Sequence, residues 1–184
     1  MAASYPTNGT FFDTLKRSFT AVPIDSSNDN AIPTSEFLEA AESLTTLFDV
    51  LGSVAFTPVK NDMLQNVKKI RDRQLAAPGK ARHCRRCGLD FTAQALRQNL
   101  SKPSDELSTS FRTAYAATLK PHHSFMIKPI FSAAMSATPY RKDFYAKLGS
   151  DQQKVEKELE AWLQGLEKCV GVLNKFLATK EAKW

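Results

Sequence analysis

Apolar residues recur every three to four positions over most of this chain, which is the period of an α-helix. One stripe predicts a helix that Thr34 or Ser35 caps and that Gly52-Ser53 ends. Its apolar positions are Phe37, Ala41, Leu44, Phe48 and Leu51. A longer stripe follows the capping residue Asp151 and consists of Val155, Leu159, Trp162, Leu166, Val170, Leu173 and Leu177. Both patterns are typical of helices that turn one face to a core.

Shorter periodic segments predict the remaining helices. A first helix contains Phe12, Leu15 and Phe19, and another is capped by Thr57, starts at Pro58 and fades near Leu75. Further helices are expected around residues 89–100, 104–114, 121–134 and 138–148, with a kink at Pro129 inside the third. No alternating run indicates a strand and no segment repeats. We therefore predict an all-α fold with a single domain over residues 1–184.

Composition narrows the class of protein. A chain of 184 residues with 42% hydrophobic content can bury a sizeable core. No apolar run approaches the ~20 residues that cross a bilayer, and the polar residues 1–9 lack the apolar centre of a signal peptide. The three cysteines, Cys84, Cys87 and Cys169, are too few for a disulfide framework and fit a reducing compartment. We expect a soluble, cytoplasmic monomer.

The net charge of +6 is concentrated in one stretch of the chain. Only Asp72 opposes its basic residues, which are Lys68, Lys69, Arg71, Arg73, Lys80, Arg82, Arg85 and Arg86. Such a cluster attracts nucleic acid or anionic lipid headgroups, and it is equally typical of a solvated loop. Because the stretch has no interleaved aromatics for base stacking and no recognition helix, we expect no nucleic-acid partner; a basic nucleic-acid-binding module stays as an alternative.

The residues that could carry chemistry are sparse. His83-Cys84-x-x-Cys87 suggests zinc, but zinc takes about four ligands, and no second paired motif supplies the rest. The sequence has no Gly-rich phosphate loop and no GxSxG motif, and its carboxylates and histidines do not suggest a hydrolytic pair. We predict no metal, no cofactor and no enzymatic activity.

Asp62, Asn66 and Lys69 are spaced four and then three apart in the helix expected after Thr57. At ~100° per residue their side chains fall within an arc of about 60°. An anion, an amide and a cation therefore share one small surface, beside an apolar stripe on the same helix. This combination suits a polyhydroxylated group better than a metal or a hydride. A solvated helix face is the alternative interpretation.

His122 and His123 follow Pro121 at an expected helix start. A helix N-terminus lowers the pKa of a histidine, so a neutral ring there can donate or accept one hydrogen bond. Taken alone, the pattern fits a buried histidine that bonds a backbone carbonyl. The 12 phenylalanines form core positions or line a cleft for an acyl chain.

Several blocks together carry a resemblance to a known family. They are Phe37-Leu38-Glu39-Ala40, Phe48-Asp49-Val50-Leu51-Gly52-Ser53, Phe56-Thr57-Pro58-Val59-Lys60, Asp62-x3-Asn66-x2-Lys69, Leu119-Lys120-Pro121-His122-His123-Ser124-Phe125, Pro129-Ile130-Phe131-Ser132-Ala133-Ala134 and Pro139-Tyr140-Arg141-Lys142-Asp143-Phe144. From about Phe11 to the C-terminus, the chain resembles the glycolipid transfer proteins, closest to the fungal heterokaryon-incompatibility members. The resemblance implies a two-layer all-α fold.

The resemblance also implies a function: binding of one glycosphingolipid and its transfer between membranes without chemistry, by a protein that is peripheral on membranes. It places Asp62, Asn66 and Lys69 on the sugar hydroxyls. Asp62 would also accept from the ceramide amide N–H, and His123 would bond the amide carbonyl. Phe125 would contact the membrane surface. The implied walls of the lipid-chain tunnel are Phe48, Leu51, Phe56, Val59, Phe91, Leu119, Phe131 and Phe144.

The chain departs from the family in one segment. Where the family reads Leu-x-Trp-Leu-x-Arg-Gly-Leu, this chain has Cys84 for the Trp and Cys87 for the Arg, and the connection from Leu75 to Gly88 is shorter. We therefore expect the helix region around residues 76–88 to be shortened or disrupted. Because a thiol has no flat face to stack on a sugar ring, we also expect impaired transfer.

Transfer of ceramide-1-phosphate or another sphingolipid is the main alternative within the same fold. A phosphate site needs several Lys or Arg side chains around it. Family members that bind phosphate usually have a basic residue at the position of Asn66. Arg85 and Arg86 keep a phosphate ligand open as an alternative. The amide at Asn66 favours the glycolipid.

Overall fold

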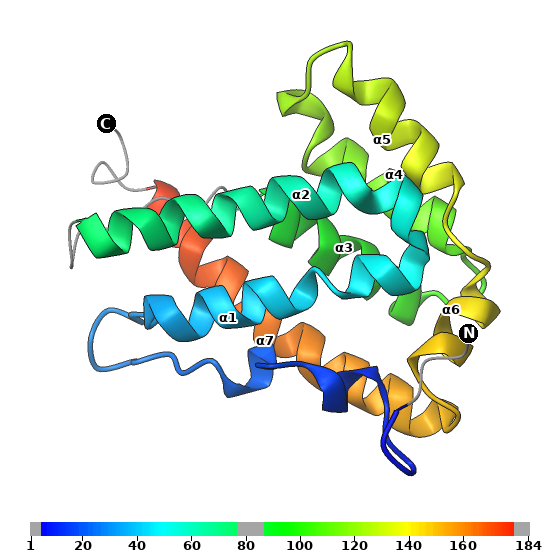
Figure 1. Ribbon diagram of the computed structural model, residues 1–184, viewed down its shortest axis with the longest axis horizontal. Helices are drawn as coiled ribbons and strands as arrows, with labels where there is room; N and C mark the ends of the chain where they lie inside the picture. Colours follow the sequence, from blue (N-terminus) through cyan, green and yellow to red (C-terminus); the bar gives the residue numbers. More distant parts are fainter. Residues whose placement is uncertain (1–4, 77–86, 179–184) are drawn as a thin grey trace.

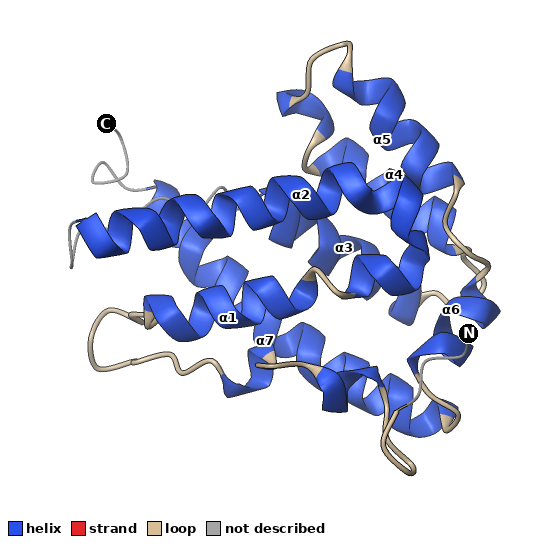
Figure 2. Ribbon diagram, viewed as in Figure 1, coloured by secondary structure: helices blue, strands red, loops and turns tan. Residues whose placement is uncertain are grey.

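The computed structural model describes residues 5–76 and 87–178, and within these ranges it is helical with no strand (Figures 1 and 2). The prediction of an all-α fold is confirmed. The α-helices are α1 (Thr34–Leu44), α2 (Leu47–Ala76), α3 (Cys87–Ser101), α4 (Leu107–Ala117), α5 (Ile127–Ser136), α6 (Arg141–Leu148) and α7 (Gln152–Ala178). Three short 3-10 turns are η1 (Phe11–Thr14), η2 (Phe19–Ala21) and η3 (Lys120–His122). No helix in the described ranges combines the length and apolar character that a bilayer crossing needs.

The helices form two layers around one core. Helix α1 packs along α2, and α3 packs on both α4 and α7; Figure 1 shows α1 and α2 crossing in front of α3 and α7. Helix α5 lies against α4 and α2 at one end of the molecule. The interior between the layers is filled by apolar side chains from all seven α-helices.

The two long apolar stripes face this core, as the spacing predicts. Phe37, Ala41, Leu44, Phe48 and Leu51 are all buried, and so are the α7 positions from Val155 to Val170 in that stripe. The cap at Asp151 is also confirmed, because its Oδ1 accepts from the Lys154 backbone N–H at 3.1 Å. Hydrophobic periodicity therefore predicts which helix faces are buried, because the whole apolar stripe turns to the core, whatever its individual contacts are.

The predicted helix up to Gly52 is divided in the structure. Helix α1 ends at Leu44, where the hydroxyls of Thr45 and Thr46 donate back to the carbonyls of Glu42 and Ser43. Such local bonds compete with helical ones. The chain then resumes as α2, so the single helix expected over this stretch is wrong.

Helix α2 bends at Gly52, whose φ of 116° only glycine adopts without strain. The helix continues past this point, and Pro58 lies inside it. The prediction that Thr57 caps a new helix with Pro58 in first place is therefore wrong. The bend at Gly52 already ends the preceding helical segment, so the interruption lies five residues before the position of Thr57.

Other expectations also differ from the structure. The helix expected over residues 121–134 begins only at Ile127, because the chain first forms the 3-10 turn η3 and then becomes extended at His123. The first predicted helix is a pair of 3-10 turns, η1 and η2, separated by extended backbone at Leu15. Pro129 lies in the first turn of α5, where the backbone N–H has no partner inside the helix. A proline ring is tolerated in the first turn, because it removes no helical hydrogen bond there. The kink expected at Pro129 therefore has no physical cause.

The N-terminal segment is held against α7 at Gly165. A Cβ at this position would lie 2.7 Å from the carbonyl carbon and oxygen of Phe19. The backbone of η2 therefore touches the helix directly. The ring of Phe19 packs edge-on against Trp162 with centroids 5.6 Å apart. This contact closes one side of the core.

Candidate functional site

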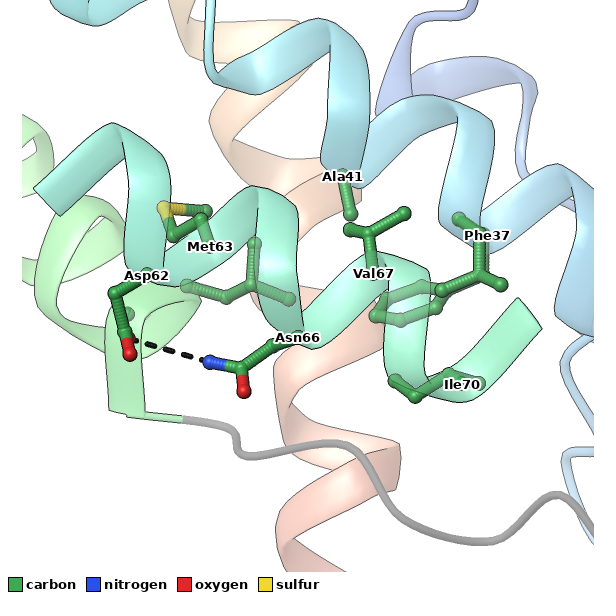
Figure 3. A pocket seen from close by; sticks show the side chains of 10 residues that line it. Phe37, Ala41, Asp62, Met63, Asn66, Val67 and Ile70 are labelled. Carbon is green, nitrogen blue, oxygen red and sulfur yellow. Dashed lines mark hydrogen bonds between the residues drawn. The ribbon is translucent and has the colours of Figure 1, made fainter. Parts of the chain in front are cut away.

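Asp62 and Asn66 lie one turn apart on α2 and point to the same side. Asn66 Nδ2 donates to Asp62 Oδ2 at 3.2 Å (Figure 3). Asp62 is exposed and Asn66 is half-buried. Lys69 is on the next turn and is exposed to solvent. Helix α2 thus offers a carboxylate, an amide and an ammonium group, and one carboxylate–amide pair is already oriented.

A hollow opens beside this pair, between α1, α2 and the first turn of α3. Its empty space, open mouth included, is about 360 Å³. Asp62 and Asn66 supply the polar part of its wall, and the rest is apolar: Phe37, Leu38, Ala41, Met63, Val67, Ile70, Gly88 and Leu89 (Figure 3). The predicted stripe of Met63, Val67 and Ile70 is therefore the apolar neighbour of the polar row.

His123 ends the turn η3 and is held by aromatic residues. Its Nδ1 lies 3.2 Å from the hydroxyl oxygen of Tyr115 on α4, and its ring centroid is 4.4 Å from that of Phe131 on α5. The partner of the half-buried ring is thus a tyrosine hydroxyl. The expectation of a backbone carbonyl partner is wrong, because the hydroxyl of Tyr115 on the adjacent helix α4 occupies this position beside Nδ1.

The electrostatics connect His123 with Asp62. Burial is the main cause that lowers the pKa of His123, and the positive groups of His122 and Lys128 lower it further. The carboxylate of Asp62 acts in the opposite direction and raises the pKa of His123. Two residues 61 positions apart in the sequence are therefore close enough to interact. The carboxylate of Asp62 therefore acts on the His123 ring across the fold, although His123 does not line the hollow beside Asp62.

The eight residues expected to line a lipid-chain tunnel are all buried. Their exposed fractions run from 0 to 7%; they are Phe48, Leu51, Phe56, Val59, Phe91, Leu119, Phe131 and Phe144. They belong to one continuous core, in which Phe48 stacks on Phe56 and Phe91 contacts Phe111 edge-on. Their role as tunnel walls remains a prediction.

Phe125 lies in the turn between η3 and α5 and is 81% exposed. Met126 and Ile130 beside it are also exposed, so an apolar patch forms here next to the half-buried Lys128. Large exposed apolar groups in one place mark contact surfaces. Phe125 is on the same turn as His123, so this surface and the polar site are neighbours.

The structure adds one residue that sequence reasoning missed, Tyr115. It continues the buried face of α4, four residues after Phe111, and reads as a core aromatic. Its hydroxyl is the feature that could have indicated a polar role, since a buried tyrosine needs a polar partner. The spacing of eight residues to His123 could not identify that partner, because η3 and the turn after it change the direction of the chain.

The candidate zinc residues His83 and Cys84 lie outside the described residues, as do the Arg85 and Arg86 positions. Elsewhere in the described part no group of three metal-ligating side chains forms. Cys169 is fully buried, and burial raises the pKa of its thiol to about 11. Its thiol stays protonated at neutral pH, so it behaves as a small apolar core residue.

Comparison with known proteins places this architecture in a family. The family model described as glycolipid transfer protein matches residues 32–86 and 83–150. A glycolipid transfer protein of Aureobasidium melanogenum is 63% identical, with 99% of this chain and all of that protein covered. Among solved structures, the fungal glycolipid transfer protein HET-C2 has a TM-score of 0.91 at 56% identity, covering 95% of this chain and all of that one.

A more distant structure shares the fold alone. The mouse ceramide-1-phosphate transfer protein without ligand has a TM-score of 0.76 at 18% identity, covering 92% of this chain and 96% of that chain. The fold is thus one that glycolipid and ceramide-1-phosphate transfer proteins share. By the match of the family model and the identity to the Aureobasidium protein, the chain belongs to the glycolipid transfer protein family.

The comparisons also bear on the segment between α2 and α3. The alignment with the Aureobasidium protein spans 203 positions although this chain has 184 residues, so at least 19 of its positions have no counterpart here. The family model matches in two segments that meet at residues 83–86. The break between the two family-model matches agrees with a disrupted region around residues 76–88, most of which lies outside the described residues.

Proposed function

We propose that this chain binds one glycosphingolipid and carries it between membranes without covalent chemistry. The observation that carries the proposal is the electrostatic interaction between Asp62 on α2 and His123 in the η3–α5 turn, beside a core of buried aromatic side chains. A polar cluster at the rim of an apolar interior has the same two-part character as a glycolipid. Membership of the family supports the same activity.

Each polar residue has a role in this proposal. Asp62, Asn66 and Lys69 bind sugar hydroxyls, because together they offer acceptors and donors in one small area. Asp62 also accepts from the amide N–H of the ceramide, and His123 bonds the amide carbonyl. A hydrogen bond to a charged group contributes about 1.5–3 kcal/mol, so Asp62 is the residue whose loss should weaken binding most.

The apolar interior offsets the cost of extracting the lipid. A chain is held in a bilayer by ~0.8 kcal/mol per CH₂, so lifting a dozen methylenes into water would cost about 10 kcal/mol. A protein sleeve of comparable apolarity removes most of that cost. The eight buried residues named above, from Phe48 to Phe144, are the proposed walls. Because the step moves a lipid and breaks no bond, the protein needs no catalytic group.

The docking surface in this proposal is the patch around Phe125. Its exposed apolar side chains insert at the membrane surface, and the nearby Lys120 and Lys128 face anionic headgroups. We further propose that the chain acts as a monomeric single domain over residues 1–184, in the cytoplasm, and as a peripheral membrane protein. It takes neither a metal nor a nucleic-acid partner in this role.

Ceramide-1-phosphate is the weaker candidate cargo. A phosphate carries up to two charges and needs several cationic side chains. On the described part of α2 the site offers Lys69 and the uncharged Asn66, while Asp62 adds a negative charge. This charge balance favours hydroxyl groups over a phosphate.

The test is native mass spectrometry of the protein after incubation with mixed vesicles that contain glucosylceramide, ceramide-1-phosphate and phosphatidylcholine. We expect a retained mass equal to glucosylceramide. Retention of ceramide-1-phosphate instead would favour the second candidate. No retained lipid, together with no transfer of fluorescent glucosylceramide between vesicles, would overturn the proposal.

A further inference from the structure

The polar site contains a buried tyrosine with no part in the roles given above. We propose that Tyr115 is a positioning residue: its hydroxyl donates to Nδ1 of His123 and thereby keeps the imidazole proton on Nε2, the atom that faces the lipid amide. This inference rests on the proposed function for the identity of the ligand. The hydrogen bond itself is present in the structure.

The ring of Tyr115 is fixed on several sides. It is 4% exposed. It stacks on Phe131 with centroids 5.4 Å apart and planes 11° from parallel, and it meets Phe91 edge-on at 6.5 Å. A ring held in this way cannot swing its hydroxyl to another partner. The Tyr115 hydroxyl oxygen and the His123 Nδ1 lie 3.2 Å apart, which is hydrogen-bond distance.

Donor and acceptor roles follow from the two side chains. A buried phenol that leaves its O–H unpaired loses free energy, so Tyr115 donates where an acceptor is in reach. Burial raises the pKa of Tyr115, and the hydroxyl keeps its proton. Burial also lowers the pKa of His123, which keeps the imidazole neutral. A neutral imidazole has one N–H and one bare nitrogen; with Nδ1 accepting, the N–H is on Nε2.

This tautomer completes a pattern with Asp62. The carboxylate can only accept, and an Nε2–H can only donate, so the two groups together match a secondary amide, which has one N–H and one carbonyl. The other tautomer would place a bare Nε2 against the carbonyl oxygen, and two acceptors repel. Tyr115 therefore favours lipids with an N-acyl group over those that lack one.

Tyr115→Phe tests this role because it removes the hydroxyl and keeps the ring. Tyr145→Phe is the matched control: Tyr145 is also a buried tyrosine, but it lies on α6, where Arg141 packs over its ring at 4.2 Å. The first readout is the ¹⁵N shift pair of His123 in the lipid-free protein at pH 8. We expect the Nε2–H tautomer in the native chain and in Tyr145→Phe, and a mixture of tautomers in Tyr115→Phe.

The second readout is affinity for two probes, glucosylceramide and glucosylsphingosine, which lacks the acyl carbonyl. We expect Tyr115→Phe to lose about tenfold in affinity for the first and almost nothing for the second, as one misplaced hydrogen bond implies. An Nδ1–H tautomer in the native chain, equal losses for both probes, or no loss for either would overturn the inference. If the native chain fails to bind glucosylceramide, the proposed function fails, while the tautomer measurement still decides the role of Tyr115.

Discussion

Two polar regions of the molecule use their charged groups in opposite ways. Between α3 and α7, Arg97 donates to both carboxylate oxygens of Glu167 at 2.8 Å and also to Glu160. These bonds raise the pKa of Arg97, and the guanidinium is occupied on three nitrogens. At the site on α2, Asp62 has one hydrogen bond among the residues that the structure describes, a 3.2 Å contact with Asn66.

The difference separates structural from binding polar groups. A carboxylate has about four acceptor positions, so Asp62 keeps most of its capacity for a ligand. Arg97 uses a donor on each of its three guanidinium nitrogens to join two helices. Polar residues with most of their bonding groups engaged hold the fold, and those with unused bonding capacity are candidates for recognition. The predictions below test this contrast from the largest expected effect to the smallest.

Asp62→Val should abolish measurable glucosylceramide binding, a loss of more than tenfold, because a hydrogen bond to a charged group contributes about 1.5–3 kcal/mol and Asp62 is assigned two ligand groups. The far-UV circular dichroism should stay helical. Asp72→Val is the matched control, since Asp72 is an exposed aspartate of the same helix that pairs with Lys68. Unchanged binding by Asp62→Val would remove Asp62 from the site.

Phe125→Ser should reduce vesicle association about tenfold, because burying one Phe side chain contributes roughly 1.5–3 kcal/mol. Sedimentation with vesicles measures this, and the melting temperature should not change. Leu75→Ser removes a side chain that is 83% exposed at the C-terminal end of α2, away from the η3–α5 turn. Equal losses for both variants would mean that no defined face docks.

Arg97→Ala should leave lipid binding intact and lower the free energy of unfolding by about 1–2 kcal/mol. The estimate is at the low end for hydrogen bonds to charged groups because the side chains are partly exposed and water screens them. Urea denaturation measures the change. A loss of lipid binding at unchanged stability would contradict the contrast between the two regions.

The pH dependence should be the smallest effect. Burial lowers the pKa of His123 in the folded protein below its ordinary value of 6.5, while Asp62, His122 and Lys128 face it. Below pH 6.5 the unfolded chain therefore binds more protons at this position than the folded chain. The stability from the neutral ring is complete above pH 6.5 and declines as the pH falls toward the folded pKa.

Thermal melts of the native chain and of His123→Gln between pH 7.5 and 5.5 measure this contribution as a difference. We expect the native chain to lose more stability than the variant as the pH falls. Parallel curves would show that His123 does not titrate in this range, because every other titrating group is common to both chains.

The sequence predicted the helical layers and the common side of α2 that Asp62 and Asn66 share, since apolar period and helical spacing are local properties. The end of a helical segment at Gly52 was also predicted, since Gly52 has non-helical backbone angles. The sequence could not predict the division at Thr45-Thr46, where two hydroxyls compete with the helix, or that the next helical segment contains Pro58 in its interior. The electrostatic interaction of Asp62 with His123 depends on how α2 packs against α5, which no local pattern contains.

The close approach at Gly165 has a consequence for the N-terminal arm. Since η2 rests directly on the helix backbone there, even a Cβ at this position would lie only 2.7 Å from the carbonyl group of Phe19, so any larger residue acts as a wedge. Gly165→Val would move the N-terminal segment that contains η1 and η2 away from α7 and expose the indole of Trp162 to water. Proteases would then cut the first two dozen residues, and the indole emission would shift to longer wavelength, while the far end of the molecule kept its shape.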